Sequence, residues 1–398
     1  MEYHFDEVNN RLGTYCTQWD YIEDRFGEKD LLPFSISDTD FKIPKPITEK
    51  IVDVAKHEIY GYTRWNHYDF KGAISQYFDR RFTTQIKEDW VMYSPSVMYS
   101  IAVLIRMFSE EGEKVVSFNP MYDAFFNVVE ANHRQLVSHH LQKVDGDFLI
   151  DFELLDQQLS DAKILLLCSP HNPTGRIWTE KELKQLIALC KKHQVKIISD
   201  EIHMDMQLKS RVHQPILKYV TDYEELYLVS SCSKTLNVPG LIGSYLIVPQ
   251  DWVREEFLVQ TRKRDFLNSA SIFGMYATMV GYTQCDDYVD QLVDYIRENM
   301  RLVAEFIKTE LPDFQFKMPD GTYLAWIDAR NVPFTSEQIQ DALIHIGKVA
   351  IMKGEIYGIN GEKYLRLNCG CPKAKLIEGL HRFKKAMDYL YEMEETKG

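Results

Sequence analysis

Residues 230–234, Ser-Ser-Cys-Ser-Lys, place a lysine behind small hydroxyl and thiol side chains, directly after the apolar run 226–229. A lysine at the end of a buried segment must reach solvent, pair with an acid or take part in covalent chemistry, because burying an unpaired ammonium group is costly. The hydroxyl groups beside it are suitable hydrogen-bond partners for an anion such as phosphate. This stretch therefore predicts a functional site around Lys234.

Polar residues also follow three other apolar runs of the middle region. Asn119-Pro-Met-Tyr122 follows residues 114–118, and the seven residues SPHNPTG, 169–175, follow residues 163–168. Asp-Glu-Ile-His, 200–203, follows residues 195–199. Loops are polar for other reasons as well, but ligands of open α/β sheets bind at the carboxyl ends of the strands. Because Asp200 and Lys234 both stand at such ends, we expect one site there.

The four apolar runs predict the elements that position this site. Each is short and continuously apolar, which is typical of strands in a parallel sheet that is covered by helices on both faces. Residues 179–194 predict a helix between two of these strands, with a capping box from Thr179 and Glu182. Strand, helix and strand form a βαβ unit, so the sequence predicts an α/β domain, to which residues 241–248 add a further strand.

The length of 398 residues predicts more than one domain. Apolar and polar residues alternate in 322–329 and 364–368, which predicts two strands. An apolar stripe near the end of the chain predicts a C-terminal helix. We expect an N-terminal segment (1–45) that joins the small domain, a large α/β domain (46–289) and a small α+β domain (290–398).

Composition narrows the class of protein. With 45% hydrophobic and 26% charged residues the chain is an ordinary globular protein, and its net charge of −13 without a long basic run argues against nucleic acid or a membrane as partner. The N-terminus does not resemble a signal peptide, and no apolar run approaches the roughly 18 residues that span a bilayer. Seven scattered cysteines fit reduced thiols, so we expect a cytoplasmic protein.

Other chemistries fit the residues less well. No glycine-rich nucleotide motif follows a strand. A metal site at Asp200–Asp205 or at Cys369 and Cys371 lacks further ligands at suitable spacing, so no metal is expected. Ser231 and Lys234 match the Ser-x-x-Lys motif of acylating enzymes, but its partner triplets are absent and Pro239 and Gly240 follow about one turn later.

Pyridoxal phosphate uses this combination of groups. Its aldehyde condenses with a lysine amine, its phosphate binds hydroxyl and N–H donors, and a carboxylate keeps its pyridine nitrogen protonated. Lys234, the neighbouring serines and Asp200 supply these three functions.

The ordered motifs resemble a known family. SPHNPTG (169–175), DEIH (200–203), SCSK (231–234) and YLRLNCGCP (364–372) are similar to those of fold-type I pyridoxal-phosphate enzymes of the aminotransferase class I/II superfamily. GYTRW (61–65), PSVMYS (95–100), NPMYDAF (119–125) and SKTLNVPGL (233–241) extend the resemblance to the MalY/PatB-type cystathionine β-lyases, a carbon–sulfur lyase branch that includes cystalysin. The implied fold is a large domain with a mostly parallel sheet flanked by helices, and a smaller α+β domain.

The resemblance implies a role for each matching residue. Lys234 would bind the cofactor covalently and act as the base, Asp200 would pair with the pyridine nitrogen, and Tyr122 would stack on the ring. Asn172 would bind the ring hydroxyl, with His203 beside it. The phosphate would be held by Ser231, Ser233, the N–H groups of Val97 and Met98, and Tyr62 of a second subunit, which implies a homodimer.

Arg366 would bind the carboxylate of an amino-acid substrate as a bidentate pair. Read without the resemblance, it could instead be the solvent-facing residue of an alternating strand, since it lies between Leu365 and Leu367.

Two departures favour the lyase branch over the transaminases of the superfamily. Transaminases commonly carry an arginine after the Gly-Leu pair, where this chain has Ile242, and a tyrosine at the position of His203. The implied reaction is β-elimination from cystathionine, cystine or cysteine to a thiol, pyruvate and ammonia. An aminotransferase, or a MalY-like protein with an added regulatory role, is the alternative.

Overall fold

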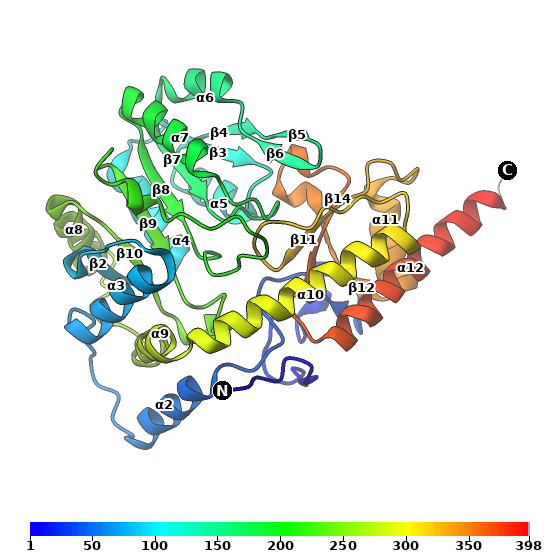
Figure 1. Cartoon of the computed structure of the whole chain (residues 1–398), viewed down its shortest axis with the longest axis horizontal. Helices are drawn as coiled ribbons and strands as arrows, with labels where there is room; N and C mark the ends of the chain where they lie inside the picture. Colours follow the sequence, from blue (N-terminus) through cyan, green and yellow to red (C-terminus); the bar gives the residue numbers. More distant parts are fainter. Residues whose placement is uncertain (397–398) are drawn as a thin grey trace.

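The computed structural model describes residues 1–396 and is built around a seven-stranded sheet (Figure 1). In spatial order its strands are β2 (Val91–Ser94), β10 (Ser244–Ile247), β9 (Leu226–Ser230), β8 (Lys196–Asp200), β7 (Ala162–Cys168), β3 (Lys114–Asn119) and β4 (Gln135–His140). The strands from β9 to β4 pair in parallel, and β10 is antiparallel to both of its neighbours. The predicted α/β class with a mostly parallel sheet is confirmed.

Successive strand residues alternate between two apolar cores, which explains why the predicted strands are apolar throughout. Ile164 and Leu166 of β7 face one core, and Leu165 and Leu167 face the other. The first core contains side chains of α4 (Val97–Phe108), α5 (Asp123–Ala131) and α8 (Asp251–Leu258). The second contains side chains of α3 (Tyr68–Phe82), α6 (Phe152–Leu159), α7 (Glu180–His193) and α9 (Ile272–Gln284).

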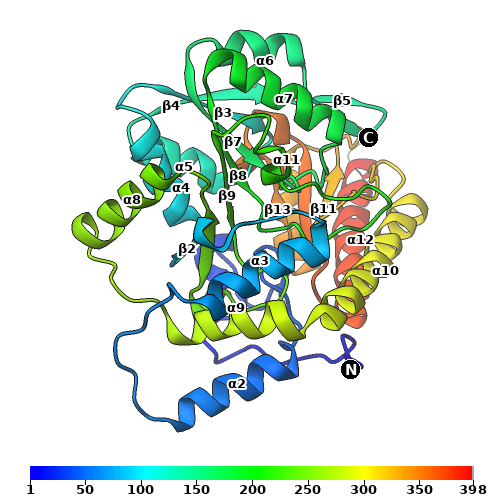
Figure 2. The same cartoon turned by 60° about the vertical axis from the view of Figure 1, so that its left-hand side comes forward.

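A smaller antiparallel sheet lies beside the large one, in the order β11 (Leu324–Asp328), β14 (Tyr364–Asn368) and β13 (Met352–Lys353). It is accompanied by α10 (Asp286–Glu310), α11 (Ser336–Ala342) and α12 (Lys373–Glu395), and Figure 2 shows α10 and α12 side by side. The short strands β1 (Leu32–Pro33) and β12 (Val349–Ala350) pair in parallel, which brings the N-terminal segment against this unit. The division at residues 45/46 and 289/290 stays a prediction, and the second of these points lies inside the continuous helix α10.

The remaining elements are short or peripheral. They are α1 (Ile22–Phe26), α2 (Lys45–Lys56), the hairpin of β5 (Gln142–Val144) and β6 (Asp147–Leu149), five 3₁₀ turns (Glu88–Trp90, Ile216–Tyr219, Pro239–Leu241, Gly354–Tyr357 and Ile359–Gly361) and two π-helical turns (Val259–Arg264 and Leu343–Gly347). Within residues 1–396, no helix combines the length and the apolar character that crossing a bilayer requires.

The expected capping box of α7 is confirmed, because the Thr179 hydroxyl accepts the Glu182 N–H and the Glu182 carboxylate accepts the Thr179 N–H. The strand expected at 241–248 is shorter, covering only Ser244–Ile247. Pro239–Leu241 instead forms a 3₁₀ turn, in which the proline fixes the backbone angle.

An irregular segment of residues 35–41, here called the strap, lies between the smaller sheet and the turn that carries Lys234. On the small-domain side, the Asn368 amide donates to the carbonyl oxygens of Ile36 and Asp38. On the large-domain side, the Asn237 amide donates to the carbonyl oxygens of Thr39 and Phe41, at 2.9 and 2.8 Å, and its oxygen accepts the Thr39 N–H at 3.1 Å. The strap therefore joins the two units through hydrogen bonds to its backbone.

We predict that Asn237→Ala lowers the free energy of unfolding by about 2–3 kcal/mol, because three hydrogen bonds to the strap are lost. Urea unfolding followed by circular dichroism measures the loss. Gln194→Ala is the matched control, because Gln194 has the same left-handed backbone (φ 56° against 55°) and an exposed side chain. Equal stability of the two variants would contradict the role of Asn237 in holding the strap.

Candidate active site

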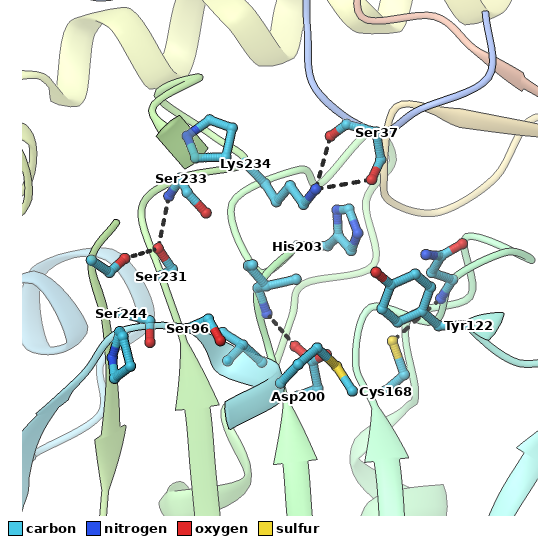
Figure 3. A pocket seen from close by; sticks show the side chains of 17 residues that line it. Ser37, Ser96, Tyr122, Cys168, Asp200, His203, Ser231, Ser233, Lys234 and Ser244 are labelled. Carbon is cyan, nitrogen blue, oxygen red and sulfur yellow. Dashed lines mark hydrogen bonds between the residues drawn. The ribbon is translucent and has the colours of Figure 1, made fainter. Parts of the chain in front are cut away.

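A cavity of about 220 Å³ lies at the carboxyl ends of the parallel strands (Figure 3). Nine of the eleven predicted site residues line it: Val97, Met98, Tyr122, Asn172, Asp200, His203, Ser231, Ser233 and Lys234. Arg366 does not line the cavity but contacts Asn172, which does. Tyr62 is exposed on the surface and does not line the cavity. The expectation that four strand ends deliver polar groups to one edge of the sheet therefore agrees with the structure.

Sheet register explains why Asp200 and Lys234 face the same space. Asp200 is the last residue of β8 and pairs with Val229 of β9, one residue before that strand ends. The chain then makes a tight turn, in which the Leu236 N–H donates to the Cys232 carbonyl at 2.9 Å, before the 3₁₀ turn at Pro239. Lys234 stands on this turn and not on a sustained helix, so the acylating Ser-x-x-Lys interpretation has no structural support.

The Lys234 side chain points across the cavity toward the strap (Figure 3). Its Nζ donates to the Ser37 hydroxyl at 2.9 Å and to the Ser37 carbonyl at 3.1 Å. Burial lowers the pKa of Lys234 to about 8, because a charged amine is poorly solvated there; the nearby Arg366 also lowers it, whereas Asp38 and Asp200 oppose the shift. A large fraction of this amine is therefore neutral near pH 8.

Burial also acts on two further titratable groups of the cavity, Asp200 and His203. It raises the pKa of Asp200 to about 7, although a hydrogen bond from the Ile202 N–H and the charge of Lys234 lower it. It lowers the pKa of His203 to about 3, so this imidazole stays neutral. Nδ1 of His203 is buried and has no hydrogen-bond partner within residues 1–396.

The N-terminus of α4 provides the anion-binding side of the cavity. The Ser96 hydroxyl caps the helix by accepting the Tyr99 N–H, and Val97 and Met98 are the first helical residues, whose N–H groups have no acceptor within the helix. Opposite them, the Ser231 hydroxyl donates to the Gly243 carbonyl at 2.6 Å and accepts the Ser233 N–H. Since Ser231 has one hydroxyl proton, it must turn away from Gly243 in order to donate to an anion.

Arg366 is buried, with 5% of its surface exposed, so the alternative in which it faces solvent is wrong. Its Nη1 donates to the Asn172 oxygen at 3.2 Å and its Nη2 to the Ser35 carbonyl at 2.8 Å. Its guanidinium lies 4.7 Å from the ring centre of Tyr357, and its Nε has no hydrogen-bond partner within residues 1–396. Arg366 thus keeps a donor for a ligand bound next to Asn172.

Tyr62 is not brought to this cavity by its own chain. Its side chain is 99% exposed, and it belongs to an irregular segment between α2 and α3. The predicted contact of Tyr62 with a second subunit therefore stays a prediction.

No pattern in the sequence points to Ser37, which accepts hydrogen bonds from the Lys234 amine. Ser37 lies on the strap, which follows neither a helical nor a strand pattern, so its contact with a residue 197 positions away depends on the fold alone. Ser96 could have been found, because a serine directly before a helix is a common N-cap.

Comparison with known proteins identifies the family of this chain. The sequence profile of aminotransferase class I and II matches residues 29–383. The chain belongs to this family. Protein MalY of Escherichia coli is 40% identical, with 95% of this chain and 97% of MalY aligned. Cystathionine β-lyase PatB of Bacillus subtilis is 35% identical, with 96% and 100% aligned. The crystal structure of cystalysin from Treponema denticola, which contains pyridoxal 5'-phosphate, superposes with a TM-score of 0.93 at 27% identity and covers 98% and 100% of the two chains.

The cavity fits the cofactor of this family. The first turn of α4 suits a phosphate, and Asp200 suits a cationic ring nitrogen, since a positive charge beside it would lower its raised pKa. The Lys234 amine reaches into the same cavity, and the unpartnered His203 Nδ1 points to a further polar contact there. The predicted fold-type I architecture and the predicted cofactor, pyridoxal phosphate, are thus confirmed, whereas the roles of individual residues stay predictions.

The pKa of Lys234 yields a prediction for cofactor attachment. Only the neutral amine attacks an aldehyde, so we expect the rate of attachment to the cofactor-free protein to rise with pH and to level off above about pH 8. Stopped-flow absorbance after mixing with pyridoxal phosphate measures this rate, and Lys234→Ala is the control that retains no cofactor after borohydride reduction. A rate that still rises toward the ordinary lysine pKa of about 10.4 would contradict the lowered value.

Proposed function

We propose that the protein is a pyridoxal-phosphate-dependent carbon–sulfur lyase that cleaves cystathionine or a related sulfur amino acid. The observation that carries the proposal is the convergence of Lys234, Asp200 and the Asn172–Arg366 pair on one cavity. The name of the relative PatB, a cystathionine β-lyase with 35% identity, supports the lyase over the transaminase.

The residues act in a defined order. Arg366 binds the α-carboxylate of the substrate next to Asn172, and this contact orients the α-hydrogen toward Lys234. When bound, pyridoxal phosphate withdraws electrons from the α-carbon. Asp200 would pair with the pyridine nitrogen and keep it protonated. The Lys234 amine, once free, would take the α-proton onto Nζ.

Loss of the β-thiolate completes the elimination. Cystathionine and water then give homocysteine, pyruvate and ammonia, so atoms balance without an oxidant or a second substrate. A transaminase would instead need a keto acid to complete its cycle.

We also propose that the protein is a cytoplasmic homodimer whose active site includes Tyr62 of the partner subunit. The support is the 99% exposure of Tyr62 and the exposed apolar side chains of Ile59 and Tyr60 beside it. The seven unpaired cysteines fit a reducing compartment.

We predict that the purified holoenzyme releases thiol and pyruvate from L-cystathionine when no keto acid is added. Lys234→Ala should reduce this rate by at least about 10³-fold, since both the covalent link and the base are removed. Thiol-reactive dye and lactate dehydrogenase follow the two products. Turnover that requires a keto acid and produces no thiol would overturn the lyase assignment.

The proposed dimer predicts subunit complementation. Tyr62→Ala and Lys234→Ala homodimers should both be weakly active, whereas a refolded equal mixture should regain about a quarter of the wild-type rate, because each hybrid dimer contains one intact site. Activity of the mixture equal to the mean of the two parents would show that Tyr62 serves its own subunit or none. Mixing each variant with itself is the control for refolding losses.

A further inference from the structure

Asp205 is a buried carboxylate that the proposed reaction does not use. It belongs to the loop that follows β8, it is 3% exposed, and it does not line the cavity. Each of its two oxygens accepts a hydroxyl group at 2.7 Å: Oδ1 from Tyr77 of α3 and Oδ2 from Thr235. Acceptance on both oxygens suits the ionised form of the side chain, which has no proton to donate.

The second of these partners, Thr235, is the residue directly after Lys234 on the turn that follows β9. Thr235 is 1% exposed and donates its hydroxyl proton to Asp205. The Lys234 amine instead lines the cavity and donates to the Ser37 hydroxyl at 2.9 Å. The turn is therefore held by hydrogen bonds at two points, by Asp205 outside the cavity and by Ser37 across it.

The bond between Thr235 and Asp205 also joins the two loops that carry the titratable groups of the cavity. Asp200, the last residue of β8, and His203 line the cavity, and the chain reaches Asp205 two residues after His203. Lys234 stands on the other loop, next to Thr235. A change in this bond therefore changes where the amine lies relative to the groups on the neighbouring loop.

Tyr77 fixes the position of the carboxylate itself. It is fully buried, and its ring stacks on Tyr282 of α9 with the ring centres 3.9 Å apart and the planes 9° from parallel. Burial raises the pKa of Asp205, and the hydrogen bonds from Tyr77 and Thr235 oppose this shift. Through Asp205, the turn of Lys234 is thus tied to two helices that cover the large sheet.

We propose that Asp205 is a positioning residue for cofactor attachment, because its contact with the Thr235 hydroxyl fixes the turn so that the Lys234 amine reaches the cofactor aldehyde. A displacement of about 1 Å in a reacting group can cost about 10²-fold in rate, so a small shift of the turn matters. The role of Asp205 rests on the proposed attachment role of Lys234 and not on the reaction that follows attachment.

Two substitutions each remove one hydrogen bond from this carboxylate. Thr235→Val removes the bond to the turn, and Tyr77→Phe removes the bond to α3 while the stacked ring stays. Stopped-flow absorbance, with cofactor-free protein and increasing pyridoxal phosphate, gives the limiting rate of attachment and the half-saturating concentration. We expect Thr235→Val to lower the limiting rate about tenfold or more and to leave the half-saturating concentration within about twofold. Tyr77→Phe should leave both within about twofold.

Urea unfolding and a conservative variant separate positioning from general stability. Both substitutions should lower the urea midpoint, since each leaves a buried carboxylate oxygen without its partner. Thr235→Ser keeps the hydroxyl and should return the limiting rate to within about twofold of the wild type. If Thr235→Val and Tyr77→Phe change the limiting rate equally, or if neither changes it, the positioning role is overturned. A rate in Thr235→Ser as low as in Thr235→Val would also overturn it.

Attachment is measured without substrate, so the outcome does not depend on whether the protein cleaves a sulfur amino acid. Borohydride reduction tests the step on which the role of Asp205 rests. Lys234→Ala should retain no cofactor after reduction, whereas wild type and Thr235→Ser should retain it. Covalently retained cofactor in Lys234→Ala would overturn the attachment role of Lys234 and the positioning role of Asp205 together.

Discussion

The structure depends on the burial of two groups of opposite charge, Lys234 and Asp200, at the ends of neighbouring strands. Burial shifts both pKa values toward neutrality, downward for the amine and upward for the carboxyl, and their mutual attraction only partly reverses this. Such a pair is costly in a protein without a ligand. A cofactor with a cationic ring nitrogen and an aldehyde changes the balance, because it gives Asp200 a partner and makes Lys234 part of a covalent bond.

The strap connects this pair to the side that would bind substrate. Ser37 accepts hydrogen bonds from Lys234, and Ser35, two residues earlier, accepts one from Arg366. The Tyr323 hydroxyl, directly before β11, also donates to the Ser37 carbonyl at 2.6 Å and fixes the strap from that side. Lys234, the proposed base, follows the large sheet, whereas Arg366, the proposed carboxylate-binding residue, belongs to the smaller sheet. Their separation is therefore set by a few residues of the strap and not by either sheet alone.

Sequence alone predicted the parts of the fold that follow from local pattern. Runs such as 163–168 are apolar throughout because both faces of the sheet are covered, and the capping box of α7 is a local hydrogen-bonding motif. The antiparallel β10 and the contact of Ser37 with Lys234 depend on tertiary packing, which leaves no periodic signal. The alternating pattern of β14 did not decide whether Arg366 faces solvent or a ligand. The strap and Tyr357 cover the Arg366 face of this strand, and that cover depends on the tertiary fold.

The electrostatics of the cavity bear on the proposed dimer. Lys234 is the one lysine or arginine among the described residues that line it, and its proposed role is to bind the aldehyde and not the phosphate. At the position where related transaminases carry an arginine, this chain has Ile242, which is 54% exposed. A phosphate here must therefore be held by neutral donors, namely the first turn of α4 and the serine hydroxyls, of which Ser231 is already committed to Gly243. A further hydroxyl from a second subunit would make up this deficit, and the fully exposed Tyr62 is the group that the sequence motif proposes for it.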